Sequence, residues 1–279
     1  MTATSTLDTA PAPQARRSRA LLPERIRAQR RPRWWQEIGF VLICYELYSL
    51  VRNAVPDQEA TALRRAAHLL SFERSLHLDP EGALNSLVAH NQVLAYACNY
   101  YYATLHFVVT IAVMVWLYRR HPLRYRALRT VVMATTLLGL VGFWLFALAP
   151  PRMLGHGFVD TIVMFHTWGS WGSSGVDSAS NQFAAMPSLH IGWALWCATV
   201  LVRLARHRWV RVLAVLYPVA TLFVILATAN HFLLDAVGGV VAVAAGYGVQ
   251  RLLSGRAAIA PPPATASINV PRQSKNTRS

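Results

Sequence analysis

The sequence predicts an all-α membrane protein with six transmembrane helices in one bundle. Three observations carry this prediction. Hydrophobic residues make up 54% of the 279-residue chain and charged residues only 14%, whereas soluble domains carry about 25% charged residues. The apolar residues gather in runs of roughly 18 or more, the length needed to cross a bilayer. Basic residues recur in every second link between these runs, which is typical of cytoplasmic loops.

The six predicted spans cover roughly residues 34–54, 95–118, 128–149, 185–203, 209–229 and 231–251. The first opens with Trp34 and Trp35, which suit the membrane interface, and no small-residue cleavage site of the A-x-A kind accompanies it. We therefore interpret it as a retained anchor and not a cleaved signal peptide. The spans form one predicted domain, residues 34–252.

The ends of the chain, residues 1–33 and 253–279, are too poor in apolar residues to form a core, and we expect both to be disordered. Of the 27 Lys and Arg residues, 22 lie in the N-terminal tail, at residues 119–129, at residues 203–211 or from Arg251 onward. This distribution predicts that both termini are cytoplasmic, in a multi-pass protein of the cell membrane. Because the net charge of +15 is spread over several short segments, it argues against a nucleic-acid partner.

Two long segments fall on the predicted outer side. Residues 56–93 contain an amphipathic stretch, which predicts an outer helix lying along the membrane surface, with its apolar residues at Leu69, Leu70, Phe72, Leu76 and Leu78. Residues 150–184 are rich in Gly and Ser and include Trp168 and Trp171. This second segment is either a flexible loop or a lid over a site that opens to lipid.

Two groups of polar residues at predicted span ends contain histidine. His231 and Asp235 are four residues apart, so they share one helical face. The carboxylate can accept a hydrogen bond from one ring nitrogen and leave the other nitrogen as a nucleophile. Ser188 and His190 open the fourth span after Pro187, where free backbone N–H groups bind anions and the imidazole can protonate a leaving oxygen. A salt bridge and a helix cap would explain the two groups without any catalysis.

A third group, Pro150-Pro151-Arg152, ends the third span on the same predicted face. A guanidinium there can hold phosphate oxygens in a bidentate manner. A lone Arg at this depth could instead be a snorkelling residue that extends its charged group to the membrane interface. An anion cradle, a nucleophile and a proton donor together are the parts that phosphoryl transfer needs. The sequence thus predicts a phosphohistidine at His231, with no cofactor and no metal required. The three cysteines form no C-x-x-C pair that would suggest a zinc site.

These motifs resemble those of the type 2 phosphatidic acid phosphatase superfamily. The stretch from Phe183 to Ala194, together with Asn230-His231 and Asp235-Ala-Val-Gly-Gly, is most similar to the inositol phosphorylceramide synthase branch. The resemblance implies a six-span fold, with His231 as nucleophile, Asp235 as its partner, His190 as acid, and Ser188 and Arg152 on phosphate.

The chain departs from the superfamily pattern at four positions. The superfamily has Lys seven residues before the Arg, Pro directly after it, Gly within Pro-Ser-Gly-His, and Arg six residues before the nucleophilic His; here these positions hold Leu145, Met153, Leu189 and Ile225. Two phosphate clamps are therefore missing, which favours the synthase-like branch, and His156 or Arg52 could supply charge instead.

The resemblance also implies a headgroup pocket near the start of the second span, formed by Tyr101, Tyr102 and His106 with Asn99. Ordinary interface aromatics would explain these residues equally well. The sequence assigns no role to Glu46, His156, Asp160 or His166. The expected substrate is a phospholipid or polyprenyl phosphate, with water or an alcohol lipid as acceptor. The alternative is a transporter or membrane scaffold without catalysis, for which no internal repeat of the kind common in transporters is visible.

Overall fold

The computed structural model describes residues 20–22, 33–53, 59–167, 183 and 185–260. Most of both predicted disordered tails, and Trp168 and Trp171 of the outer loop, lie outside the described residues. All regular structure within the described part is helical, in the order α2 (Trp34–Asn53), α3 (Glu59–Ser75), α4 (Glu81–Ala89), α5 (Gln92–Tyr100), a π-helical turn η1 (Tyr101–Leu105), α6 (His106–Arg120), α7 (Pro122–Leu145), a 3₁₀ turn η2 (Pro151–Met153), α8 (Thr161–Met164), α9 (Leu189–Leu204), α10 (Arg208–Ala227) and α11 (Leu233–Ser254).

Four helices of the described part are long and apolar enough to cross a bilayer: the continuous α5-η1-α6 helix (Gln92–Arg120), α7, α10 and α11. Helix α9 is apolar but shorter, and α2 contains the predicted first span. The described part is therefore all-helical with four candidate membrane spans, as an all-helical membrane protein requires, while six spans, with crossing by α2 and α9, stay a prediction. Large apolar side chains such as Val219 and Val241 are more than half exposed on α10 and α11, as expected for surfaces that face lipid.

The third predicted span ends earlier than expected. Helix α7 stops at Leu145, and residues 146–149 leave the helix. There the Leu148 amide donates to the Phe183 carbonyl at 2.8 Å, and the Ala185 amide donates to the Leu148 carbonyl at 3.4 Å. The two prolines that follow cannot extend a helix. The change of direction carries Arg152 toward the turn between α10 and α11.

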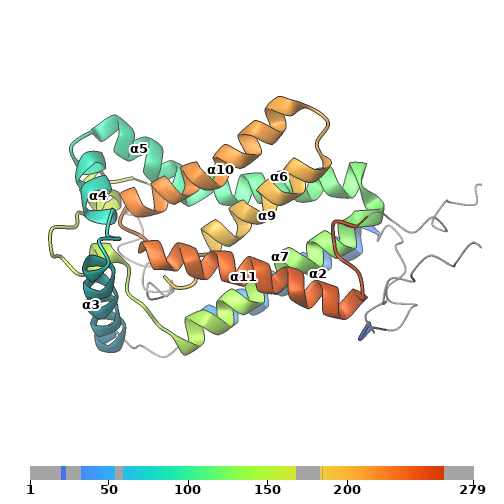
Figure 1. Cartoon of the computed structure of the whole chain (residues 1–279), viewed down its shortest axis with the longest axis horizontal. Helices are drawn as coiled ribbons and strands as arrows, with labels where there is room; N and C mark the ends of the chain where they lie inside the picture. The colour runs from blue at the N-terminus through green and yellow to red at the C-terminus, as the bar shows by residue number, and fades with distance from the viewer. Residues whose placement is uncertain (1–19, 23–32, 54–58, 168–182, 184, 261–279) are drawn as a thin grey trace, which may run out of the picture.

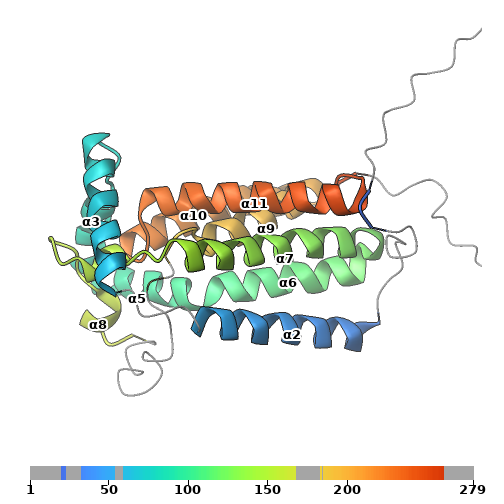
Figure 2. The same ribbon diagram turned by 90° about the horizontal axis from the view of Figure 1, so that it is seen from below.

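The long helices α6, α7, α9, α10 and α11 run side by side, with α2 along one face of the bundle next to α7 (Figures 1 and 2). The amides of Leu21 and Leu22 donate to carbonyls in the last turn of α11, so these two residues lie at the end of the bundle where α11 ends. Glu37 of α2 pairs with Arg129 of α7 and accepts a hydrogen bond of 3.0 Å from the Tyr125 hydroxyl. These contacts attach α2 to the bundle.

Helices α3 and α4 lie at the opposite end, and α3 runs across the bundle axis (Figure 2). The buried face of α3 consists of Ala62, Ala66, Leu70 and Glu73. The apolar stripe predicted from the sequence is therefore divided: Leu70 packs inside the protein, whereas Phe72, Leu76 and Leu78 are about half exposed. A helix forms where it was predicted, and its position along a membrane surface stays a prediction.

Candidate active site

Two histidines from different helix starts come together beneath α3 and α4. The imidazole rings of His190, in the first turn of α9, and His231, just before α11, have centroids 5.5 Å apart. Nε2 of each ring is buried and has no hydrogen-bond partner. Buried polar atoms are nearly always paired, and two orphaned ring nitrogens side by side indicate a site for a ligand.

The predicted pair of His231 and Asp235 forms. Nδ1 of His231 lies 3.3 Å from Oδ2 of Asp235, and this oxygen also accepts a hydrogen bond of 2.9 Å from the Phe232 amide. Asp235 is completely buried and His231 nearly so. With the proton on Nδ1, the Nε2 lone pair of His231 is free to act as a nucleophile.

His231 is not on the helix, as the spacing predicted, but two residues before its start. The reason is the tight turn between α10 and α11. Ala229 has φ of +51°, a left-handed conformation that L-residues other than Gly rarely adopt. Asn230 closes the turn with a hydrogen bond of 2.8 Å to the Thr228 hydroxyl. Such strain is often found at functional sites, where surrounding structure holds it in place.

Ser188 precedes α9 and is completely buried. Its amide donates to the Asp235 carbonyl at 2.9 Å, so the start of α9 is attached directly to α11. Its hydroxyl has no partner and caps no backbone amide. Ser188 Oγ is thus a third orphaned polar atom and is available to donate to a phosphate oxygen.

Arg152 reaches the same region from η2. Its amide donates to the Ala229 carbonyl at 3.0 Å, and its guanidinium hydrogen-bonds the Asn230 side chain, next to His231. Its Nε also lies 3.1 Å from the carboxylate of Asp160. Asp160 caps α8 by accepting from the amides of Ile162 and Val163. The sequence assigned no role to Asp160, and the structure makes it the ion-pair partner of Arg152.

The start of α6 completes the cluster. Tyr102 stacks on the His190 ring with centroids 4.5 Å apart, and the His106 ring lies 4.3 Å from the same ring. Tyr102 belongs to the π-helical turn η1, and π-turns inserted in α-helices occur frequently at functional sites.

Two other candidates for the headgroup pocket have partners elsewhere. The Tyr101 hydroxyl lies 2.9 Å from that of Thr221 on α10. The Asn99 amide donates to the Thr161 carbonyl and the Thr167 hydroxyl. Both residues attach the second span to neighbouring segments and are not brought to the histidine pair.

Sequence reasoning missed two buried carboxylates next to the site, Glu73 of α3 and Glu81 of α4. Both are completely buried, and both accept hydrogen bonds from the first amides of α11. A signal was present: Glu73 falls on the same face of α3 as Ala62, Ala66 and Leu70. A charged residue on an otherwise apolar face is a candidate for a buried partner.

The other proposed sources of positive charge are not placed at the site. His156 is exposed, with φ of +36°, and the Arg52 side chain lies outside the described part of the structure. Among the described residues, no group of three or more His, Cys, Asp or Glu side chains is arranged to hold a metal ion.

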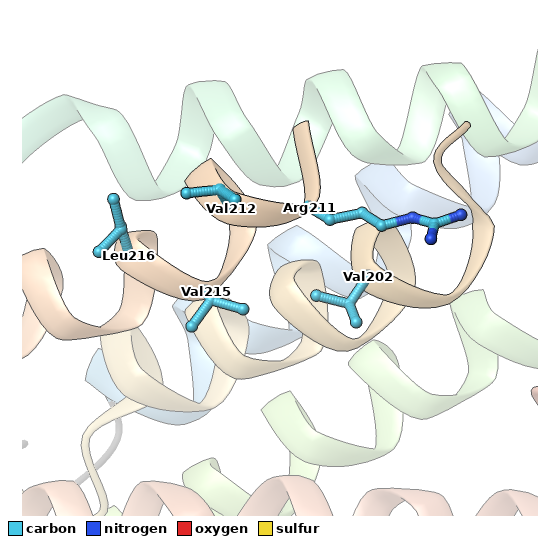
Figure 3. A pocket seen from close by; sticks show the side chains of 5 residues that line it. All are labelled: Val202, Arg211, Val212, Val215 and Leu216. Carbon is cyan, nitrogen blue, oxygen red and sulfur yellow. The ribbon is translucent and has the colours of Figure 1, made fainter. Parts of the chain in front are cut away.

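A surface pocket of about 320 Å³ lies away from the histidines, between the end of α9 and the first half of α10 (Figure 3). Its lining consists of Val202, Arg211, Val212, Val215 and Leu216. Val202 is about 18 Å along α9 from His190, at 1.5 Å per residue. The apolar lining offers no group for catalysis.

One of the comparisons with known proteins identifies a family. A family model described as the PAP2 superfamily matches residues 67–249, a range that contains every element around the two histidines. No curated protein and no solved structure matches the chain. Because the match covers well over half of the chain, this protein belongs to the PAP2 superfamily, whose members act as lipid phosphatases or phosphotransferases in membranes.

Proposed function

We propose that this protein transfers a phosphate group from a membrane lipid through a covalent phosphohistidine at His231. The observation that carries the proposal is the pair of buried imidazoles. Their ring centroids lie 5.5 Å apart, and Nε2 of each ring has no hydrogen-bond partner. A phosphate group that reaches both Nε2 atoms would meet a nucleophile at His231 and a proton donor at His190, the two groups that phosphoryl transfer to histidine needs.

In the first step, Nε2 of His231 attacks phosphorus and forms a P–N bond while the P–O bond to the lipid breaks. His190 gives its proton to the departing lipid oxygen. Asp235 stabilises the positive charge that develops on the His231 ring, as a buried carboxylate does in other histidine-based sites. Ser188 Oγ and Arg152 donate hydrogen bonds to the phosphate oxygens.

In the second step, the acceptor hydroxyl attacks phosphorus and loses its proton to His190, and the P–N bond breaks to restore His231. With water as acceptor the reaction is hydrolysis, and with a lipid alcohol it is transfer. The superfamily clamps missing at Leu145 and Ile225 favour the synthase-like branch and therefore an alcohol acceptor. Tyr102 and His106, in contact with His190, would contact the headgroup or acceptor.

We further propose that the site faces the outside of the cell and needs no metal. The basic residues of the links after α6 and α9 and of the last turn of α11 support this orientation, because these segments lie at the end of the bundle away from the histidines. Arg152, the Ser188 hydroxyl and the free amides of helix starts would together balance the phosphate charge.

The test uses the purified full-length protein in detergent micelles with a panel of phospholipids and polyprenyl phosphates, with and without a lipid alcohol. Released phosphate indicates hydrolysis, and a new phospholipid indicates transfer. The His231→Ala variant should lose both activities, whereas the His68→Ala variant, at an exposed position of α3, should keep them. Unchanged turnover by His231→Ala would reject the phosphohistidine route. No turnover of any lipid by the unaltered protein would favour the transporter or scaffold alternative.

A further inference from the structure

The first turn of α11 is held by two carboxylates that come from outside the bundle. Oε1 of Glu81 accepts from the Leu233 amide at 2.5 Å, and Oε1 of Glu73 accepts from the Leu234 amide at 2.7 Å. The amide just before these two, that of Phe232, donates to the carboxylate of Asp235 itself. Three carboxylates therefore bind three successive amides directly after His231.

Each glutamate uses only one of its two oxygens in this way. Oε2 of Glu73 and Oε2 of Glu81 are buried and have no donor among the described residues. The two glutamates accept from neighbouring amides of α11, which brings their carboxyl groups near enough for a hydrogen bond between them. Two carboxylates can form such a bond only if one of them is protonated, because an ionised carboxylate has no proton to donate. A single proton shared by the pair accounts for both orphaned oxygens.

The charges around the pair favour this proton. Glu73 faces Glu81 and Asp235, and Glu81 also faces Asp79, whose own partner is Arg74 at 3.4 Å on the surface. Burial, aided by the neighbouring carboxylates, raises the pKa of the Glu73 carboxyl to about 8, and burial also raises the pKa of Glu81. Full ionisation of the pair would bury two negative charges beside Asp235.

We propose that Glu73 and Glu81 are positioning residues that share one proton and fix the first turn of α11, and with it His231 and Asp235, in the catalytic arrangement. The proposal rests on the proposed role of His231. It assigns α3 and α4 a function that their sequence did not suggest: their carboxylates fix the position of the nucleophile, His231, through the amides that follow it. The pair touches no reacting atom.

The first experiment measures kcat and KM for phosphatidic acid in detergent micelles. Glu73→Ala and Glu81→Ala remove an acceptor of an α11 amide, and each should lower kcat about 10- to 100-fold, because small displacements of a catalytic group are costly. KM should change much less, since substrate does not touch the pair. Glu73→Gln and Glu81→Gln keep an oxygen for the amide and should retain activity near pH 7. The exposed Glu59 at the start of α3 serves as control, as Glu59→Gln.

The second experiment follows thermal unfolding between pH 7 and 9. The native pair keeps its proton up to about pH 8, whereas a glutamate in the unfolded chain, with a pKa near 4.5, has lost it. The unfolding temperature should therefore fall as the pH rises from 7 to about 8 and then level. In the two Gln variants this fall should disappear, and their activity should persist above pH 8.

The outcomes separate this inference from the function on which it rests. If the unfolding temperature of both Gln variants falls with rising pH as it does in the unaltered protein, the shared proton is overturned, even if His231→Ala is inactive. Wild-type kcat in both Ala variants would overturn the positioning role. If an Ala variant does not fold, the kinetics and the unfolding of the Gln variants test the proposal. If His231→Ala is fully active, the proposed function fails, while the unfolding measurement still decides whether the pair shares a proton.

Discussion

His231 depends on three neighbours that come from distant parts of the chain. Asp235 orients its ring, Asn230 and Ala229 form the turn that holds its backbone, and Arg152 binds to both residues of that turn. Each neighbour has a different chemical task, so substitutions at these positions should change different kinetic constants.

Replacing Asp235 with Asn should abolish most activity with little effect on folding. Asn keeps an oxygen for the Phe232 amide, but it cannot stabilise an imidazolium or enforce the same tautomer of His231. In other histidine-based sites this type of change lowers kcat by about 10⁴-fold, and we expect a loss of at least about 10²-fold in phosphate release from phosphatidic acid. A thermal unfolding curve close to that of the unaltered protein would serve as the control. Full activity of Asp235→Asn would show that the carboxylate does not orient the nucleophile.

Replacing Asp160 with Asn should strengthen substrate binding. Asn remains a good cap for α8, but it no longer competes for the Arg152 guanidinium, whose Nε lies 3.1 Å from the carboxylate. A partly exposed ion pair is worth up to about 1 kcal/mol, so KM for an anionic lipid should fall by up to about five-fold, with kcat changed little. Arg152→Ala should raise KM instead. A higher KM for Asp160→Asn would mean that the pair positions Arg152 for substrate and does not compete with it.

At the scale of the elements, the site exists because α7, α9 and α11 approach one another closely around Pro187 and Ser188. A Cβ atom at Gly239 would lie 2.4 Å from the Ser188 carbonyl oxygen, and one at Gly142 would lie 2.4 Å from Cδ of Pro187. Only glycine allows the start of α9 to rest directly on α11. The bond from the Ser188 amide to the Asp235 carbonyl needs the same contact.

Two glycines of α11 offer a matched comparison. Gly239→Ala must push the Ser188 backbone away and should strongly reduce both stability and activity. Gly248 has nothing within 4 Å of an added Cβ, so Gly248→Ala should stabilise the helix by about 0.5–1 kcal/mol and leave activity unchanged. Thermal unfolding and phosphate release check both variants. If Gly239→Ala behaves like Gly248→Ala, the close contact of α9 with α11 is not required.

At the scale of the whole molecule, the bundle has two chemically different ends. The histidine site, α3 and α4 occupy one end, and Leu21, Leu22 and the end of α11 lie at the other (Figures 1 and 2). The family match begins within α3 and excludes α2. The matched range therefore includes Glu73 and the whole of α4, whereas α2 lies outside it.

The proposed orientation predicts different labelling of the two ends in intact cells. His156 is exposed on the loop near the site, and His207 is exposed between α9 and α10 at the other end. In a chain with Cys44 replaced by Ser, His156→Cys should react with a membrane-impermeant maleimide in intact cells, and His207→Cys only after the cells are opened. The buried Cys98 and Cys197 should remain unlabelled. The reverse pattern would invert the topology.

The sequence by itself determined the features that depend on local order along the chain. Runs of apolar residues predicted the helices, because a bilayer or a buried interior selects hydrophobic side chains over a fixed length. The four-residue spacing of His231 and Asp235 predicted their contact, and the family motifs predicted that Ser188, His190 and Arg152 would matter. Helix ends also depend on contacts between distant segments: α7 ends early, and Leu148 beyond its end pairs with Phe183 and Ala185.

Only the tertiary structure decided which polar residues surround the histidines. Glu73 and Glu81 bind amides 161 and 152 residues further along the chain, and nothing in the local pattern specifies such a distant partner. The same holds for Tyr102 and His106, which contact His190, and for Tyr101, which binds α10 instead. Hydropathy and spacing report the environment that a residue prefers, whereas its partner is fixed by how whole helices pack against one another.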